Sequence, residues 1–301
     1  MEGRKLIIRG TSNKILWLKE IGEHRSFLSK LSPLDGSPIE FDIRQIEYLE
    51  PLHVVSLACL FEEAKSRHAH SKILVHFDKK NPACQYLIDS NFFQYWKRDF
   101  NREHVANSTI AATLGIWKVQ SEGIPGYVTY VQRYFENNYL HDQCLDSLKV
   151  ALDELFNNIF DHSVSPVDGF VTIQYYPNKH QLIFAVADFG IGIPNGINNY
   201  LQKIGQPIVT EKDALVLAFR QRFSIKSILQ NKGEGLHTLA GIIKNTNGSM
   251  NLFSNRARVR YNNGIFKKSA FKPYFEGTIF EIILDATFFE SAEDRIDNLE
   301  I

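Results

Sequence analysis

The sequence ALDELFNNIFDHS at residues 151–163, read together with VADFGIGIP at 186–194, is the most informative part of this chain. Residues in an α-helix rotate by about 100° each, so Glu154, Asn158 and Asp161 share one narrow arc of the first segment. The opposite side carries the apolar residues that a core would receive, Leu148, Leu152, Leu155 and Ile159. A solvated helix face would show the same pattern. The second segment, a predicted strand ending in a glycine turn, favours a site for a nucleotide and a divalent metal.

The composition is that of a globular protein with one large domain or two. The 301 residues include 34 basic and 34 acidic side chains, so the formal net charge of zero gives no general argument for nucleic acid or for an anionic membrane. No apolar run is long enough to span a bilayer, and the first ten residues lack the core of a signal peptide. Three dispersed cysteines without a CxxC motif predict buried thiols in a reducing cytoplasm.

The first hundred residues predict strands alternating with helices, which is typical of an α/β layer structure. The expected strand, helix, strand and helix lie at 39–43, 52–66, 72–77 and 82–96. The mixed stretch that follows, residues 101–126, ends in Gly and Pro and is interpreted as a linker.

A second unit is predicted from residue 127 to residue 285. Its expected helices lie at 127–140, 141–163 and 233–248, and its expected strands at 169–177, 181–188, 249–255, 256–261 and 277–284. Residues 193–232 form a long segment rich in Gly, Asn, Gln and Lys, and residues 286–301 are interpreted as a polar tail.

Four short motifs succeed one another in this unit. They are Glu154-x-x-x-Asn158-x-x-Asp161-His162, Asp188-x-Gly190-x-Gly192, Gly233-x-Gly235-Leu236 and Gly277-Thr278. In this order they resemble the motifs of the GHKL ATP-binding fold, also called the Bergerat fold, an α/β sandwich shared by gyrase B, the MutL repair proteins, the large heat-shock chaperones and histidine kinases. The resemblance covers residues 127–285 and implies ATP and Mg²⁺ as ligands.

The first motif suits magnesium and phosphate chemistry. An ATP triphosphate needs a metal to neutralise it, and Mg²⁺ prefers hard oxygen ligands. Asn158 offers a neutral oxygen for that ion. Glu154, one turn earlier, is placed to orient or deprotonate a water or hydroxyl that attacks the γ-phosphate. The resemblance gives Asp161 and His162 supporting roles in nucleotide binding.

The second and fourth motifs suit adenine. Asp188, at a strand end, can accept a hydrogen bond from the exocyclic amine of adenine, which selects adenine over guanine. Gly190 and Gly192 permit backbone conformations and a close ligand approach that a Cβ would block. Thr278 is expected to reach the adenine side directly or through a water.

The third motif leads into a predicted helix N-terminus, whose free N–H groups and dipole favour phosphate. Its members are Gly233, Gly235 and Leu236. The segment 193–232 resembles the ATP lid of the family, and its basic residues Lys226 and Lys232 are expected to touch the terminal phosphates when the lid closes. An amphipathic helix followed by a solvated loop is the alternative interpretation of this segment.

Other interpretations of the glycines fit less well. Gly190-x-Gly192-x-x-x-Gly196 follows a strand as in a dinucleotide-binding fold, but Pro194 interrupts the required helix start and no βαβ repeat follows. A Walker-type loop is absent, because Lys232-Gly233 has the wrong order and no Ser or Thr follows. A further alternative is that the glycines serve turns alone.

The rest of the chain narrows the kind of protein that the resemblance implies. No segment resembles the dimerisation helices of histidine kinases or the transducer domain of gyrase and MutL, and the helix motif is closest to that of the anti-sigma serine kinases. The first unit, residues 1–100, resembles the STAS fold of anti-sigma-factor antagonists. Where that family carries a phosphorylatable Ser or Thr, this chain reads Tyr48-Leu49-Glu50-Pro51-Leu52. A docking role for this unit therefore fits better than regulation by its phosphorylation.

The sequence thus predicts a cytoplasmic, Mg²⁺-dependent ATP-binding regulator that hydrolyses ATP or phosphorylates a protein Ser or Thr. Its expected partner is a STAS-like or sigma-factor-like regulator, and a second copy of the chain is a further candidate. One alternative is an ATP-gated interaction switch without significant turnover. Another is a nucleic-acid-linked ATPase, for example in phage defence, in which Arg256, Arg258 and Arg260 would form a basic stripe along one strand face; a solvated hairpin face is the simpler interpretation of that stripe.

Overall fold

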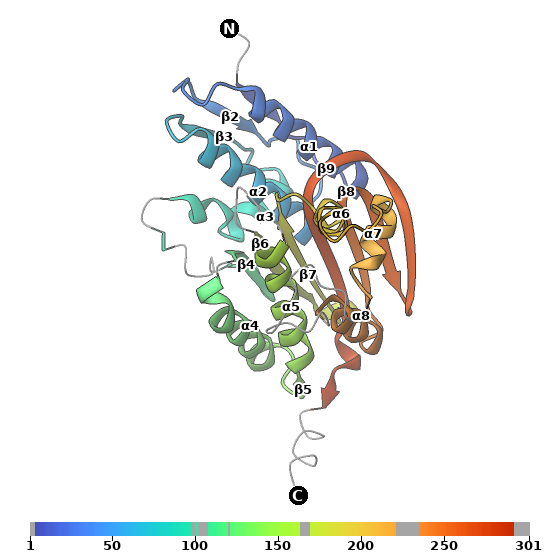
Figure 1. Ribbon diagram of the computed structural model, residues 1–301. Coiled ribbons are helices and arrows are strands. Elements are labelled where there is room, and N and C mark those ends of the chain that lie inside the picture. The colour runs from blue at the N-terminus through green and yellow to red at the C-terminus, as the bar shows by residue number, and fades with distance from the viewer. Residues whose placement is uncertain are drawn as a thin grey trace, which may run out of the picture.

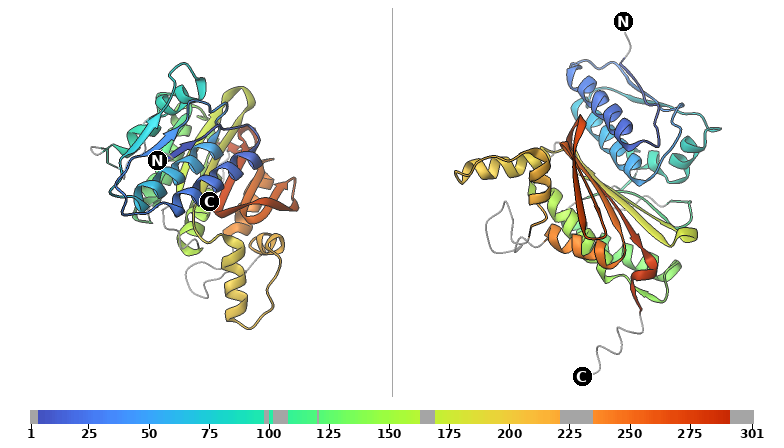
Figure 2. Two further views of the ribbon diagram at one scale, coloured as in Figure 1. Left: turned by 90° about the horizontal axis from the view of Figure 1, so that it is seen from above. Right: turned by 90° about the vertical axis from the view of Figure 1, so that its right-hand side faces the viewer.

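The computed structural model describes residues 4–97, 100–101, 108–119, 121–162, 169–220 and 235–291. Within these ranges the elements stack in four layers (Figures 1 and 2). A group of helices covers one face of a five-stranded sheet, two N-terminal helices cover its other face, and a small three-stranded sheet lies beyond them. The chain is therefore mixed α/β, as the sequence predicts.

The N-terminal unit builds the two layers of small sheet and helices. Its elements are β1 (Lys5–Ile7), α1 (Lys14–Lys30), β2 (Ile39–Asp42), α2 (Pro51–Arg67), β3 (Ile73–His76), α3 (Pro82–Asp89) and the 3-10 turn η1 (Phe92–Trp96). The strands β1, β2 and β3 pair in that order, and both pairs are parallel. Polar caps mark the helix starts: the side chain of Asn13 accepts hydrogen bonds from the first turn of α1, and Asn81 does the same for α3.

The second unit begins with β4 (Thr113–Lys118), the turn η2 (Ser121–Gly123), α4 (Ile124–Asn138), β5 (Gln143–Cys144) and α5 (Asp146–His162). It continues with β6 (Phe170–Tyr176), η3 (Pro177–Lys179), β7 (Gln181–Asp188), α6 (Ile193–Lys203), α7 (Glu211–Leu217) and α8 (Gly235–Asn245). The last elements are β8 (Ser249–Asn262), β9 (Ile265–Asp285), η4 (Ala286–Phe288) and β10 (Glu290–Ser291). The five-stranded sheet has the antiparallel order β4-β6-β7-β9-β8.

The helix α2 lies between the two sheets. Every residue from Pro51 to Ala64 is buried, so this helix has no solvent face over most of its length. The ring of Phe61 is 4.3 Å from that of Phe41 on β2, and the Cys59 thiol reaches the Ala187 carbonyl on β7 at 3.5 Å. The two units consequently share one apolar core across α2.

Most elements expected from the sequence are present. The predicted strands at 39–43, 72–77, 169–177 and 181–188 correspond to β2, β3, β6 and β7, and the helices expected at 52–66 and 233–248 correspond to α2 and α8. Cys59, Cys84 and Cys144 are buried free thiols, as predicted. Among the described residues, no helix combines the length and apolar character needed to cross a membrane.

Several boundaries differ from the prediction, because long-range pairing extends strands that local patterns cut short. Residues 101–126 are not simply a linker, since β4 lies within them and pairs with β6. The strands expected at 249–255 and 256–261 form the single strand β8, which continues through irregularities in its pairing with β9. The helices α6 and α7 occupy much of the segment expected to be a lid, and β10 of the expected tail pairs with β5. Neither β1 nor α1 was predicted.

Candidate functional site

Two polar residues of the predicted site meet at the end of the central strands. Asp188 is the last residue of β7, and Thr278 lies directly opposite it on β9. The side chains of Leu182, Phe184 and Val186 on β7 belong to the core beneath α4, α5 and α8. Because side chains alternate along a strand, Asp188 faces this same layer, and its partner in the register faces it too. Asp188 and Thr278 are only 2% and 3% exposed.

A glycine turn follows Asp188, and β8 holds it in place. The Gly190 N–H donates to Asp188 Oδ1 at 2.7 Å, which closes the turn onto the carboxylate. Ser254 Oγ accepts a hydrogen bond from the Ile193 N–H at 3.0 Å. Asn255 Nδ2 donates to the Ile191 carbonyl at 3.0 Å. Both side chains were missed by the sequence analysis, although the consecutive polar residues Ser254 and Asn255 interrupt the alternation of polar and apolar residues in β8.

Glycine is required at two places around this turn. Gly192 has a φ of +82°, and a Cβ there would overlap Asn255 Oδ1 and lie 2.7 Å from Ser254 Oγ. Gly277 has a φ of +127°, and a Cβ there would overlap the Asp188 carbonyl oxygen. Gly192 precedes α6 and Gly277 lies within β9, and at both positions the absence of a Cβ lets β7, β8 and β9 approach closely beside Asp188.

The protonation of Asp188 is unusual. Burial raises the pKa of this carboxyl to about 7, although the Gly190 N–H, the Arg25 charge and the Thr278 N–H each favour the ionised form. The ionised carboxylate thus loses its hydration on burial, and the surrounding groups only partly replace that stabilisation. A ligand that donates hydrogen bonds would supply the missing stabilisation.

The hydroxyl of Thr278 is connected to the same turn. Ser254 Oγ donates its one hydrogen to the Gly277 carbonyl at 2.7 Å, and it lies 3.2 Å from Thr278 Oγ1. Since the Ser254 hydrogen is used, Thr278 is the donor of this pair and keeps its oxygen lone pairs as acceptors. Asp188 and Thr278 together thus offer acceptors on one side of the sheet.

The helix motif lies on α5, next to α8. The helix α5 packs against both α4 and α8, and its apolar residues Leu148, Leu152 and Leu155 are fully buried. Glu154 is partly buried on the side predicted from the periodicity. Asn158, Asp161 and His162 lie in the last turns of α5, and their side chains fall outside the description.

The remaining residues that were predicted to bind the nucleotide fall partly inside and partly outside the described part of the chain. Gly235 is the first described residue of α8, which lies where a helix was expected, whereas Leu236 is 9% exposed and packs in the core. Lys226, Lys232 and Gly233 lie outside the described residues. Within the described part of the chain, no three His, Cys, Asp or Glu side chains form a metal-binding group.

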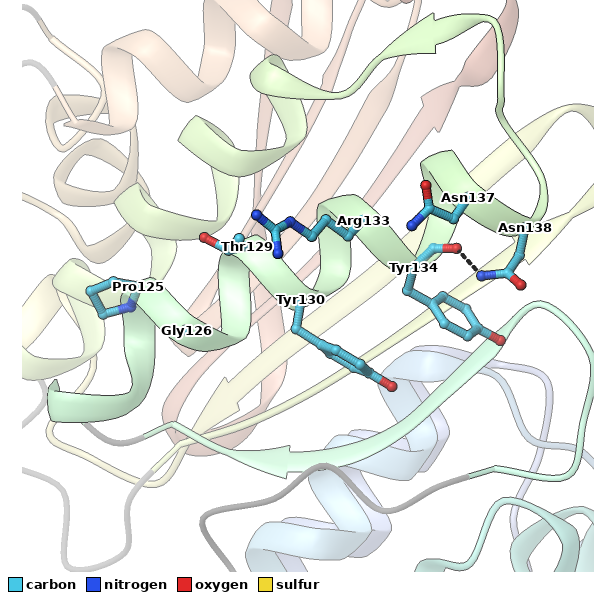
Figure 3. A pocket seen from close by; sticks show the side chains of 8 residues that line it. All are labelled: Pro125, Gly126, Thr129, Tyr130, Arg133, Tyr134, Asn137 and Asn138. Carbon is cyan, nitrogen blue, oxygen red and sulfur yellow. Dashed lines mark hydrogen bonds between the residues drawn. The ribbon is translucent and has the colours of Figure 1, made fainter.

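Two surface hollows among the described residues lie away from this site. One, of about 650 Å³, runs along the exposed side of α4, and its described lining residues belong to that helix, among them Tyr130, Arg133 and Tyr134 (Figure 3). A second, of about 520 Å³, lies between α2, β3 and η1, where Phe61, Phe77 and Trp96 line it. None of the predicted site residues lines either hollow.

Two further sequence expectations have structural explanations. Arg258 packs over the Phe253 ring and donates to Asn251 Oδ1 at 2.8 Å, and Arg256 lies over the Tyr274 ring. Two residues of the supposed basic stripe are thus engaged with the protein, which favours the simpler hairpin interpretation. Glu50 caps α2 and pairs with Lys14 Nζ at 2.9 Å, so its carboxylate has a structural role.

The sequence matches no protein-family model and no curated protein. The GHKL fold therefore stays an expectation from the four sequence motifs.

Proposed function

We propose that this chain is a Mg²⁺-dependent ATP-binding regulator whose nucleotide site lies between the ends of β7 and β9 and the helices α5 and α8. On this proposal the second unit is a GHKL-type ATP-binding domain, and the first is a STAS-like unit packed on its back. The observation that carries the proposal is the pairing of Asp188 with Thr278 on the face of the sheet that α5 and α8 cover.

The chemistry of this pair suits adenine. The exocyclic amine of adenine donates hydrogen bonds, whereas guanine presents a carbonyl oxygen at the same position. A buried carboxylate that lacks a cation of its own favours the donor and rejects the acceptor. The Thr278 hydroxyl, which keeps its lone pairs, offers a second acceptor on the same side.

On this proposal, residues of α5 and α8 bind the phosphates of the ligand. Mg²⁺ would be held through the Asn158 oxygen, with Asp161 and His162 in support, and would neutralise the triphosphate when bound. The N-terminus of α8 at Gly235 would favour the phosphates through its free N–H groups and its dipole. Glu154 would orient or deprotonate the attacking water or protein hydroxyl.

Two uses of the bound nucleotide are proposed. In the first, the chain hydrolyses ATP or transfers its γ-phosphoryl group to a Ser or Thr of a protein partner, such as a STAS-like or sigma-factor-like regulator. In the second, ATP binding without significant turnover changes a partner-binding surface. The core shared across α2 favours this second use, because a change at β7 would be transmitted to α1 and α2.

Binding and turnover can be tested separately with the full chain. Isothermal titration with ATP and Mg²⁺ is expected to show one site that ADP shares and GTP does not occupy. Asp188→Asn should weaken ATP binding by about a hundredfold, since it replaces the charged acceptor that faces the amine. The matched control Asp285→Asn changes a carboxylate at the opposite end of the β7–β9 pair, in register with Gln181, and should leave the affinity unchanged. Equal affinity of ATP for the native chain and for Asp188→Asn would overturn the adenine assignment.

Incubation with ATP labelled on the γ-phosphate then distinguishes the uses. Label on a protein indicates a kinase, and free phosphate alone indicates an ATPase. Glu154→Gln should retain ATP binding and lose either activity at least a hundredfold. Binding of ATP by the native chain with neither product would leave the switch as the function.

A further inference from the structure

A single arginine of the N-terminal unit reaches the backbone beside both adenine-side residues. Arg25 lies on α1 and is only 7% exposed. Its Nη1 donates to the Glu276 carbonyl, and its Nη2 donates to the Phe189 carbonyl at 3.4 Å. The guanidinium carbon also lies 3.9 Å from the centre of the Phe189 ring.

The two carbonyls that Arg25 contacts lie next in the chain to the candidate site residues. Phe189 follows Asp188 at the end of β7, and Glu276 precedes Gly277 and Thr278 on β9. One planar guanidinium therefore links the backbone just after Asp188 to the backbone just before Gly277 and Thr278. Arginine suits this task because its donors are held in a rigid fork, whereas a lysine presents one compact ammonium group.

The arginine is itself held from α2. Its Nε donates to Glu63 Oε2 at 2.7 Å, and Glu63 is 1% exposed. The other oxygen of Glu63 accepts a hydrogen bond from Arg67 Nε at 2.9 Å. Since α2 is packed between the two sheets, the orientation of Arg25 depends on how the N-terminal helices sit on the large sheet.

We propose that Arg25 is a positioning residue that sets the relative placement of Asp188 and Thr278, and so couples the N-terminal unit to nucleotide affinity. The coupling to the nucleotide rests on the proposed function, whereas the action of Arg25 on Asp188 does not. By thermodynamic linkage, a partner that shifts α1 would change ATP affinity, and ATP would change the affinity for that partner by the same factor.

The charge of Arg25 acts on Asp188 from behind the sheet, and this allows the action to be measured. Two groups of the N-terminal layer interact electrostatically with Asp188, the Arg25 cation on α1 and the Cys59 thiol on α2. Removal of the Arg25 charge leaves Asp188 with less support for its ionised form. The pH at which Asp188 ionises should therefore rise, and an arginine that only filled space would leave this pH unchanged.

The first experiment needs no nucleotide. Urea unfolding of the native chain, Arg25→Met, Asp188→Asn and the double variant is measured from pH 5 to pH 8. Arg25→Met should destabilise the chain more at pH 8 than at pH 5, and this pH dependence should be smaller when Asp188 is already Asn, because only the Glu63 carboxylate then loses the Arg25 charge. A destabilisation whose pH dependence is the same in both backgrounds would overturn the action of Arg25 on Asp188.

The second experiment measures ATP affinity by titration. Arg25→Met should weaken binding about tenfold at pH 7 and move the pH profile of binding upward. Arg25→Lys keeps the charge but cannot span both carbonyls, so it should weaken binding without moving the profile, and it serves as the test where the Met variant does not fold. Arg67→Met removes the outer partner of Glu63 and is the matched control, with native affinity expected. Native affinity in both Arg25 variants would overturn the coupling. If the native chain binds no ATP, the proposed function fails, and the unfolding experiment alone decides the action of Arg25.

Discussion

Two buried carboxylates lie on neighbouring central strands of this protein, on opposite faces of the same sheet. Asp188 on β7 faces α5 and α8, and Glu281 on β9 faces the N-terminal helices; they are 2% and 1% exposed. Glu281 meets Lys14 Nζ at 2.6 Å and accepts a hydrogen bond from Asn251 Nδ2 at 2.9 Å. Asp188 receives the Gly190 N–H, while Arg25 directs its donors to two carbonyls and to Glu63.

The difference separates a structural carboxylate from one suited to a ligand. Burial raises the pKa of Glu281, but Lys14 opposes this shift, and the pair fastens α1 to the back of the sheet. Asp188 has no lysine or arginine on its own carboxylate among the described residues, and its pKa rises to about 7. Folding therefore buries the Asp188 carboxylate beside a turn at a cost in free energy. A ligand that donates hydrogen bonds to this carboxylate could remove that cost.

The largest expected effect that tests this comparison is on stability against pH. The pKa of Asp188 is about 7 in the folded chain and ordinarily 3.8, so the folded state retains a proton that the unfolded state loses across this window. Native stability should fall as the pH rises from 4 to 7. Asp188→Asn cannot ionise and keeps an acceptor for the Gly190 N–H, so it should be more stable than the native chain above pH 7, by up to about 4 kcal/mol. Urea unfolding between pH 4 and pH 8 measures the difference.

The matched variant on the other face should behave in the opposite way. Glu281→Gln leaves Lys14 with Glu50 alone and should lower the free energy of unfolding at pH 7 by about 2 kcal/mol. If Glu281→Gln stabilised the chain at pH 8 as Asp188→Asn is expected to do, the two carboxylates would be equivalent and the comparison would fail.

A second effect, of about 3 kcal/mol, concerns the glycines that bring the strands together. Gly277→Ala would place a Cβ on the Asp188 carbonyl oxygen at a φ of +127°, and backbone atoms cannot move aside as a side chain can. The melting temperature should fall accordingly. Gly241→Ala is the control: its site in α8 has no atom within 4 Å of the new Cβ, so the variant should gain about 1 kcal/mol. Equal effects of the two substitutions would show that the close approach at Gly277 costs nothing.

The smallest effect is on ligand affinity against pH. If the ionised Asp188 carboxylate accepts a hydrogen bond from the adenine amine, ATP affinity should fall about tenfold for each pH unit below 7. The reason is that the protonated Asp188 carboxyl of the free protein must lose its proton before the ligand binds. Titration with adenosine as well as ATP separates this effect from the titration of the phosphates. Asp188→Asn should show weak binding that does not vary between pH 5 and pH 7. A profile in the native chain that is equally flat would place the ligand away from this carboxylate.

Much of the local structure could be predicted because it depends on local interactions. The periodicity of α2, the strand at β7 and the polar stripe of α5 were all legible from short windows. The extent of β8 and β9 was not, since the strands expected at 249–255, 256–261 and 277–284 left residues 265–276 of β9 out until their cross-strand partners were known. For the same reason β4 was interpreted as part of a linker, although it forms an edge of the large sheet.

The candidate site shows the same division. The sequence alone indicated Asp188, Gly192 and Thr278, because a carboxylate before glycines at a strand end is a local pattern. It gave no sign of Arg25, which contacts the Glu276 carbonyl from 251 residues away along the chain. The signal for Ser254 and Asn255 was present as a polar pair in a strand, but their partners in the glycine turn could not be inferred from it.

The sequence by itself therefore determined which elements form and which residue types stand at their ends, because periodicity, caps and glycine act over a few neighbouring residues. The tertiary structure decided that Asp188 and Thr278 lie opposite each other, that Lys14 neutralises Glu281 and not Asp188, and that α2 joins two sheets in one core. These outcomes depend on strand register and on burial, both of which are set by packing between residues far apart in the chain.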